Sequence, residues 1–231
     1  YRVVYYDQRA SGRSLVPPSD SVSIKHLVND LDALRKQLNV ERLNLLGHSW
    51  GAVLATHYAV AYPERVESII YSNPAMLSRE YDQEAARITA QKTSKPDSLH
   101  RVRIFGKGLL SVADYDTLMH LGFRSSAHLP GNMEALHLDL PSNFQLANKV
   151  LFGGLMKDPA MHANLYDSLS DFRFPVLIIH GQADVIPYSA IERLNRSIPG
   201  SKLIVLKESG HFPFVEEREK YLEVISDFIK R

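Results

Sequence analysis

The sequence predicts an α/β fold, in which a mostly parallel β-sheet is flanked by helices and carries a long helical insertion. Short β-branched and apolar runs alternate with helical patterns over residues 1–73 and again over residues 175–231, whereas residues 74–174 show little strand character. Alternation of strands and helices is typical of a parallel sheet with both faces covered. We therefore expect two parts of one core, separated by an insertion of helices.

The first part of the core begins with residues 2–6, whose β-branched and aromatic side chains predict a buried strand. Leucines at three- to four-residue spacing predict a helix near residues 24–38, with Ser21 or Ser23 as its N-cap. Apolar runs predict further strands at residues 42–46 and 66–71. The helix between these two strands is expected to end at Pro63, because proline cannot continue it.

The rest of the chain is divided in the same way, from periodicity and from the positions of proline and glycine. In the insertion we expect helices at residues 80–92, 99–121, 143–157 and 158–170. In the last part we expect strands at residues 176–179 and 202–206, a helix near residues 189–197 and a final helix from about Glu216.

Composition limits the classes of function. Hydrophobic residues make up 45% of the 231 residues, which is enough for a core, and no apolar run is long enough to span a bilayer. The net charge of +1 gives no electrostatic reason to expect nucleic acid or an anionic membrane surface as partner. The absence of cysteine excludes disulfides, a thiolate nucleophile and cysteine-ligated metal. The histidines show no metal-ligand spacing, so we expect neither metal nor cofactor.

The segment with the clearest chemical meaning is residues 47–51 (GHSWG), directly after the apolar run at residues 43–46. A strand, a sharp turn with serine at its apex and a helix form the G-x-S-x-G nucleophile elbow, which exposes the serine hydroxyl above the end of a sheet. An ordinary strand–helix turn is the alternative. The pattern makes Ser49 the candidate nucleophile, whereas His48, beside it in the turn, is expected to point away and to have a structural role.

A serine nucleophile needs a base, and the base needs a carboxylate. Asp184 follows the strand expected at residues 176–179, and His211 follows the one expected at residues 202–206. Serine, acid and histidine thus occur in the order used by this class of site, each at the carboxyl end of a strand. The backbone N–H of Trp50 is the expected first donor of an oxyanion hole. No His-Gly-Gly type sequence that would supply a second donor precedes Ser49.

Four motifs together resemble those of the proline iminopeptidases, within the α/β-hydrolase superfamily. They are residues 7–14 (DQRASGRS), 47–51 (GHSWG), 181–184 (GQAD) and 209–211 (SGH). The resemblance spans nearly the whole chain and implies an α/β-hydrolase fold, with Ser49 as nucleophile, His211 as base and Asp184 as its partner. It also implies that residues 74–174 form a helical cap over the site, and that Asp7 and Arg9 hold their loop near it.

The chain departs from this family in two respects. The family has further strands before the one that matches residues 2–6, so we expect a preceding segment, either in a longer protein or as a separate chain. The iminopeptidases also bind the free amino terminus of the substrate with cap glutamates, but residues 143–156 contain no acid. The substitutes available in the cap are Glu134, Asp158 and Glu84. Phe212 is a candidate wall of the acyl pocket, with core packing as the alternative.

These observations predict a serine hydrolase that acts on a small molecule or short peptide through an acyl-enzyme. An iminopeptidase-like aminopeptidase that releases N-terminal residues is the first hypothesis within this class. A carboxylesterase or a C–C bond hydrolase is the alternative. A binding protein on the same fold that has lost catalysis is a third hypothesis, because a fold alone does not guarantee activity.

Overall fold

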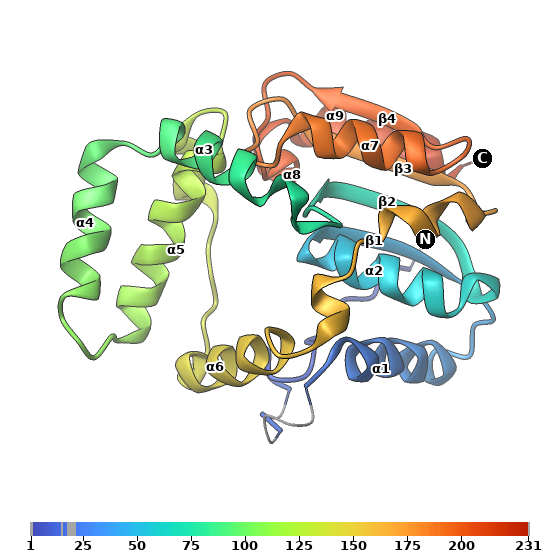
Figure 1. Ribbon diagram of the computed structural model, residues 1–231, viewed down its shortest axis with the longest axis horizontal. Coiled ribbons are helices and arrows are strands. Elements are labelled where there is room, and N and C mark those ends of the chain that lie inside the picture. The colour runs from blue at the N-terminus through green and yellow to red at the C-terminus, as the bar shows by residue number, and fades with distance from the viewer. Residues whose placement is uncertain (1, 15, 18–21, 231) are drawn as a thin grey trace.

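The computed structural model describes residues 2–14, 16–17 and 22–230. Its centre is a four-stranded, all-parallel sheet in the order β1-β2-β3-β4 (Figure 1). The strands are β1 (Leu43–Ser49), β2 (Val66–Pro74), β3 (Val176–Gly181) and β4 (Lys202–Leu206). The carboxyl ends of all four strands therefore lie at one edge of the sheet, which is where open α/β sheets build their sites.

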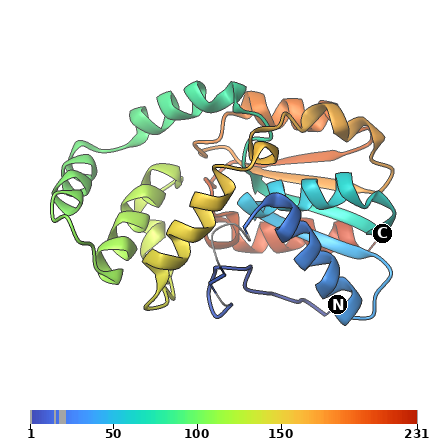
Figure 2. The same cartoon turned by 60° about the horizontal axis from the view of Figure 1, so that its bottom comes forward.

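The helices divide into those that cover the sheet and those of the segment between β2 and β3. Helices of the first group are α1 (Ile24–Gln37), α2 (Trp50–Ala61), α7 (Tyr188–Ser197), α8 (Pro213–Glu216) and α9 (Arg218–Ile229), with the 3₁₀ turn η2 (Pro63–Arg65). Those of the second group are α3 (Asp82–Lys92), α4 (Lys95–Phe105), α5 (Val112–Ser126) and α6 (Phe144–Leu155), with 3₁₀ turns η3 (Arg79–Tyr81), η4 (Pro130–Ala135), η5 (Pro159–His162) and η6 (Tyr166–Asp171). Helices α4 and α5 extend away from the sheet (Figures 1 and 2).

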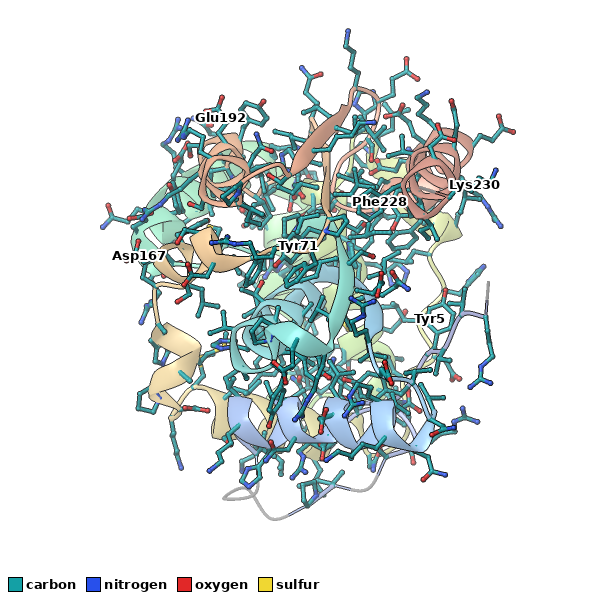
Figure 3. The ribbon with its side chains drawn as sticks, turned by 90° about the vertical axis from the view of Figure 1, so that its right-hand side faces the viewer. Tyr5, Tyr71, Asp167, Glu192, Phe228 and Lys230 are labelled. Atoms are coloured by element: carbon teal, nitrogen blue, oxygen red, sulfur yellow. The ribbon has the colours of Figure 1, made fainter. Side chains whose placement is uncertain are left out.

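Alternate residues of the central strands belong to different cores, as the two-residue period of a strand requires. Ile69 and Tyr71 of β2 join the larger core, which packs against α1, α2 and α7. Ile70 of β2 joins the smaller core on the opposite face, against Tyr221 and Phe228 of α9. Figure 3 shows Tyr71 between the helices α7 and α9, which lie on opposite sides of the sheet. Both faces of the middle strands are therefore covered.

The prediction that residues 2–6 form a buried strand is wrong. These residues belong to no strand, and the side chains of Val3 and Tyr5 are 70% and 92% exposed. The apolar run carries strand propensity, but propensity alone forms no strand without a partner for its backbone. In the described part of the chain β1 pairs with β2 only. Tyr1 lies outside the described residues.

Two helix predictions in the segment between β2 and β3 also need correction. The helix expected at residues 99–121 is two helices, α4 and α5, separated by a turn in which Gly108 has φ +80°. The helix expected at residues 158–170 is replaced by the short turns η5 and η6. Pro159 and the hydrogen bond from the Ala160 N–H to the Asp158 side chain begin a 3₁₀ turn there.

Most remaining elements agree with the predictions. The strand β4 has the predicted bounds, and α1 and α7 differ from prediction by one residue at one end. Ser23 is the N-cap of α1, accepting a hydrogen bond from the His26 N–H, whereas Ser21 lies outside the described residues. Among the helices described, none combines the length and apolar character that crossing a bilayer requires.

Candidate active site

Ser49 lies at the apex of the sharp turn that joins β1 to α2. Its φ of 51° and ψ of −116° fall in a sparsely populated region for a residue with a side chain. Gly47 allows the tight return of the chain, because a Cβ there would lie 2.5 Å from the Gly51 carbonyl oxygen. The strained serine and the close approach of strand and helix are the backbone features that a nucleophile elbow requires.

Trp50 is the first residue of α2, so its backbone N–H has no acceptor within the helix. This N–H can therefore donate a hydrogen bond to the oxyanion of a substrate bound near Ser49. The indole Nε1–H of Trp50 donates to the Gln8 side-chain oxygen at 3.3 Å. Arg9, the next residue, forms a two-pronged ion pair with Asp30 at 2.6 Å, so the loop at residues 7–14 is held beside the elbow.

Asp184 and His211 are brought together at the carboxyl edge of the sheet. The His211 Nδ1–H donates to Asp184 Oδ2 at 2.8 Å, and the Asp184 side chain is fully buried. Burial opposes ionisation of this carboxyl, but the charge and hydrogen bond of His211 keep its pKa below the usual value. With Nδ1 as donor, the other ring nitrogen, Nε2, is left to accept a proton.

The buried carboxylate has two further donors. The Asn73 Nδ2–H₂ donates to Asp184 Oδ2 at 2.7 Å, and the Ile186 N–H donates to Oδ1 at 3.1 Å. Asn73 also donates to the Gly210 carbonyl oxygen at 2.9 Å, next to His211. Asn73 therefore fixes both Asp184 and the loop between β4 and α8 that carries His211 (residues 207–212, the histidine loop). It follows an apolar run at the end of β2, which is the one signal in the sequence that marks it.

His48, expected from the sequence to point away from the site, touches the candidate base. Its Nε2–H donates to the His211 carbonyl oxygen at 2.7 Å, and the two rings lie 4.8 Å apart between centroids. Burial, followed by the charge of His211, lowers the pKa of His48 to about 4. His48 is therefore neutral at pH 7 and connects the elbow to the histidine loop.

The hydrogen bonds of the described residues include none between the Ser49 hydroxyl and the His211 ring. The contact of His48 with His211 nevertheless puts the residue next to Ser49 against the base. Hydrogen bonds between nucleophile and base are often long in free enzymes and shorten when substrate binds. The structure thus brings two of the three predicted catalytic residues into contact and keeps the third on the adjoining turn.

The residues predicted to touch substrate have other surroundings. Both carboxylate oxygens of Asp158 accept main-chain hydrogen bonds, from Ile24 at 2.7 Å and from Ala160 at 3.0 Å. Glu84 accepts a hydrogen bond from the Ser189 hydroxyl at 2.8 Å. Glu134 is exposed on η4. Among the described residues, no hydrogen bond joins Asp158, Glu84 or Glu134 to Ser49.

Phe212, the residue after His211, is 5% exposed and packs with Ala127 and Met133 in a small apolar cluster. Its ring meets that of His211 edge to face, with 5.2 Å between centroids. The described residues contain no group of three or more His, Asp or Glu side chains that could hold a metal ion.

The chain is similar to known proteins of one fold family. The sequence profile of the alpha/beta hydrolase fold matches residues 1–218. The chain is 28% identical over 240 residues to a proline iminopeptidase of Saccharolobus solfataricus, covering 98% of this chain and 75% of that protein. A proline iminopeptidase of Lactobacillus delbrueckii subsp. bulgaricus is also 28% identical, over 99% of this chain and 80% of that one.

Two solved structures show the same fold. One is Est816, described as an N-acyl homoserine lactone degrading enzyme, with 26% identity, a TM-score of 0.67, and coverage of 96% of this chain and 80% of that one. Another is an α/β fold family hydrolase from Bacillus anthracis, with a TM-score of 0.74, 22% identity and the same coverage. The second likeness concerns the fold alone.

Proposed function

The chain belongs to the α/β-hydrolase fold family, and from this premise we propose that it is a serine hydrolase that forms an acyl-enzyme on Ser49. The observation that carries the proposal is the buried Asp184–His211 hydrogen bond at 2.8 Å, whose histidine also contacts His48 of the strained turn of Ser49 through its backbone. A binding protein without catalysis has no need for this arrangement of strain, base and buried acid.

In the proposed mechanism His211 Nε2 takes the proton of the Ser49 hydroxyl as its oxygen attacks the substrate carbonyl carbon. The Trp50 N–H stabilises the resulting oxyanion, and Asp184 stabilises the imidazolium. The tetrahedral intermediate then collapses, and His211 passes its proton to the leaving group. Water, deprotonated by the same imidazole, cleaves the acyl-enzyme and regenerates the Ser49 hydroxyl.

Small uncharged esters and amides are the substrate class that the structure supports best. A free amino terminus needs a carboxylate, because an unpaired ammonium is costly to bury. The carboxylates of Asp158 and Glu84 are already in hydrogen bonds with the protein, and Glu134 is exposed. The second candidate function, an aminopeptidase for N-terminal proline, is favoured by the names of the sequence relatives.

Labelling with a fluorophosphonate probe tests the chemistry. We expect the wild-type protein to be labelled and Ser49→Ala to be unlabelled, with turnover of short p-nitrophenyl esters reduced by about 10⁴-fold or more in the variant. Equal labelling of both proteins, or no labelling and no turnover by the wild type, would contradict the proposal. Comparing p-nitrophenyl esters with proline arylamides separates the two substrate classes: preferential hydrolysis of the arylamides would favour the aminopeptidase.

A further inference from the structure

Lys92 is the last residue of α3, in the segment between β2 and β3. Its side chain reaches the loop between β3 and α7 that carries Asp184 (residues 182–187, the acid loop). Its half-buried ammonium donates to the carbonyl oxygen of Ala183, the residue before Asp184. It also donates to the carbonyl oxygen of Ala127, which directly follows α5, at 3.3 Å. One cation therefore joins two segments that are far apart in the sequence.

The same end of α5 rests on the histidine loop. The His211 N–H donates to the Ser126 carbonyl oxygen at 2.7 Å. Gly210 leaves no space for a side chain against that oxygen, since a Cβ there would overlap it. On the other side, the Ala183 N–H donates to the Ser209 carbonyl oxygen at 2.9 Å. The acid loop and the end of α5 thus both touch the histidine loop.

These contacts form a closed ring that runs from Lys92 through the acid loop to Asp184 and His211, and returns through Ser126 and Ala127. We propose that Lys92 is a positioning residue, which holds the acid loop and the end of α5 at a fixed spacing and so keeps Asp184 and His211 aligned. The proposal rests on the proposed function, because alignment matters only if His211 acts as base.

Two carbonyl oxygens in contact with one side-chain nitrogen favour a cation with several donors. An ammonium has three donors, so it can bond two carbonyl oxygens at once, and its bonds are stronger than those of a neutral group. Burial lowers the pKa of Lys92, whereas the charges of Asp184 and Glu216 raise it. An apolar side chain of the same length would avoid the cost of burying charge but would leave both carbonyl oxygens without this partner.

Glu216, a negatively charged residue, also joins the end of α5 to the histidine loop. Its carboxylate accepts from the His128 N–H and from the Gly210 N–H, each at 2.7 Å. The end of α5 is therefore fixed to the histidine loop without Lys92, whereas the Ala183 carbonyl oxygen depends on the ammonium. Loss of Lys92 is expected to loosen the acid loop while the segment stays docked.

The absence of cysteine from the chain allows a specific test. Lys92→Cys introduces the sole thiol, and 2-bromoethylamine converts it into a side chain that is a sulfur analogue of lysine. A cavity of about 420 Å³, lined by Lys92 and Asp184 among others, gives the reagent access. Iodoacetamide, which adds a neutral amide of similar length that still has two N–H donors, is the control that tests whether the positive charge is needed. Lys95→Cys, at an exposed position, is the control for the treatment.

We expect Lys92→Cys to lower kcat for short p-nitrophenyl esters by about 10- to 100-fold with little change in KM, as misalignment of about 1 Å can do. Aminoethylation should restore most of kcat, and iodoacetamide should not. The proposal is overturned if kcat is unchanged in Lys92→Cys, if KM changes instead, or if both reagents restore activity equally. Lys95→Cys should match the wild type before and after treatment.

A spectroscopic measurement separates this proposal from the proposed function. The His211 Nδ1 proton, held in the bond to Asp184, should give a downfield proton NMR signal that is absent in His211→Ala. We expect the signal to broaden in Lys92→Cys and to return after aminoethylation. If the wild type hydrolyses nothing yet the signal behaves in this way, the proposed function fails and the positioning role stands. If the wild type is active and the signal ignores position 92, the positioning role alone fails.

Discussion

Asn73 meets two demands that few residue types satisfy together. Its φ of +44° lies in the left-handed region, which asparagine tolerates better than most residues with a side chain. Its side-chain amide donates to both Asp184 Oδ2 and the Gly210 carbonyl oxygen, and the residue is fully buried. The two acceptors belong to the acid loop and the histidine loop, so this single amide holds the two loops together.

We predict that Asn73→Ala lowers kcat/KM for ester substrates by about tenfold, equivalent to about 1.4 kcal/mol. The free energy of unfolding should fall by about 1–3 kcal/mol, because a buried carboxylate oxygen and a buried carbonyl oxygen lose a donor. Asn39→Ala is the matched control: Asn39 also has a positive φ, of 55°, but is exposed. If both variants lose equal activity, the backbone conformation and not the amide is responsible.

At the scale of elements, the two adjacent glycines of α6 differ in what surrounds them. A Cβ on Gly154 would lie 2.7 Å from both the Cβ and the carbonyl oxygen of Val22, whereas a Cβ on Gly153 would meet no atom within 4 Å. Val22 and Leu155 belong to the same core. The missing side chain at position 154 therefore sets how closely α6 approaches the segment before α1.

The glycine pair gives a prediction with its control inside one helix. Gly154→Ala should lower the free energy of unfolding by about 1–3 kcal/mol, since a methyl group is forced against a backbone oxygen. Gly153→Ala should be neutral or should stabilise the protein by up to about 1 kcal/mol through helix propensity. Urea unfolding measures both. A Gly154→Ala protein as stable as Gly153→Ala would mean that α6 moves away without cost.

The sequence predicted best the elements whose structure depends on local pattern. The runs that form β3 and β4 are apolar and bounded by turn residues, so their periodicity was sufficient. Residues 2–6 also have β-branched and aromatic side chains but are exposed, because a strand also needs a paired neighbour, which composition does not reveal. The pattern at residues 158–170 likewise predicted a helix where a proline and an aspartate side chain start a 3₁₀ turn.

The candidate site divides in the same way. Asp184 and His211 were predicted from their positions after strands, and they are hydrogen-bonded. The sequence assigns no role to Asn73, Lys92 or Glu216, because each contacts a carbonyl, carboxylate or backbone N–H of a distant segment. Contacts of side chains with main chain follow no spacing rule in a sequence. The roles of such residues can be recognised only from the folded structure, which shows which loops lie next to each other.

At the scale of the whole molecule, Asp32 is the buried charge that joins the helices on one face of the sheet. Its carboxylate on α1 pairs with Arg35 and Lys36 of the same helix, at 2.9 and 3.0 Å. It also pairs with Arg65 of η2 at 2.9 Å and accepts from the Tyr58 hydroxyl of α2 at 3.2 Å. Burial opposes ionisation of Asp32, but these cations together hold its pKa well below the usual value.

This shift predicts how stability depends on pH. A carboxylate whose pKa is lower in the folded state stabilises the fold above its unfolded pKa of about 3.9, and this contribution is lost as the pH falls through the folded pKa. Asp32→Asn should therefore lower the free energy of unfolding at pH 7 by about 1.5–3 kcal/mol. The difference from wild type should be constant above about pH 5 and should narrow as the pH falls below about 4.

Asp167→Asn is the control, because the Asp167 side chain is 80% exposed (Figure 3). Its free energy of unfolding should differ from that of the wild type by less than about 0.5 kcal/mol at every pH. Urea unfolding between pH 3 and pH 7 measures these differences, and a gap for Asp32→Asn that widens toward acid pH would show that the carboxylate destabilises the native state.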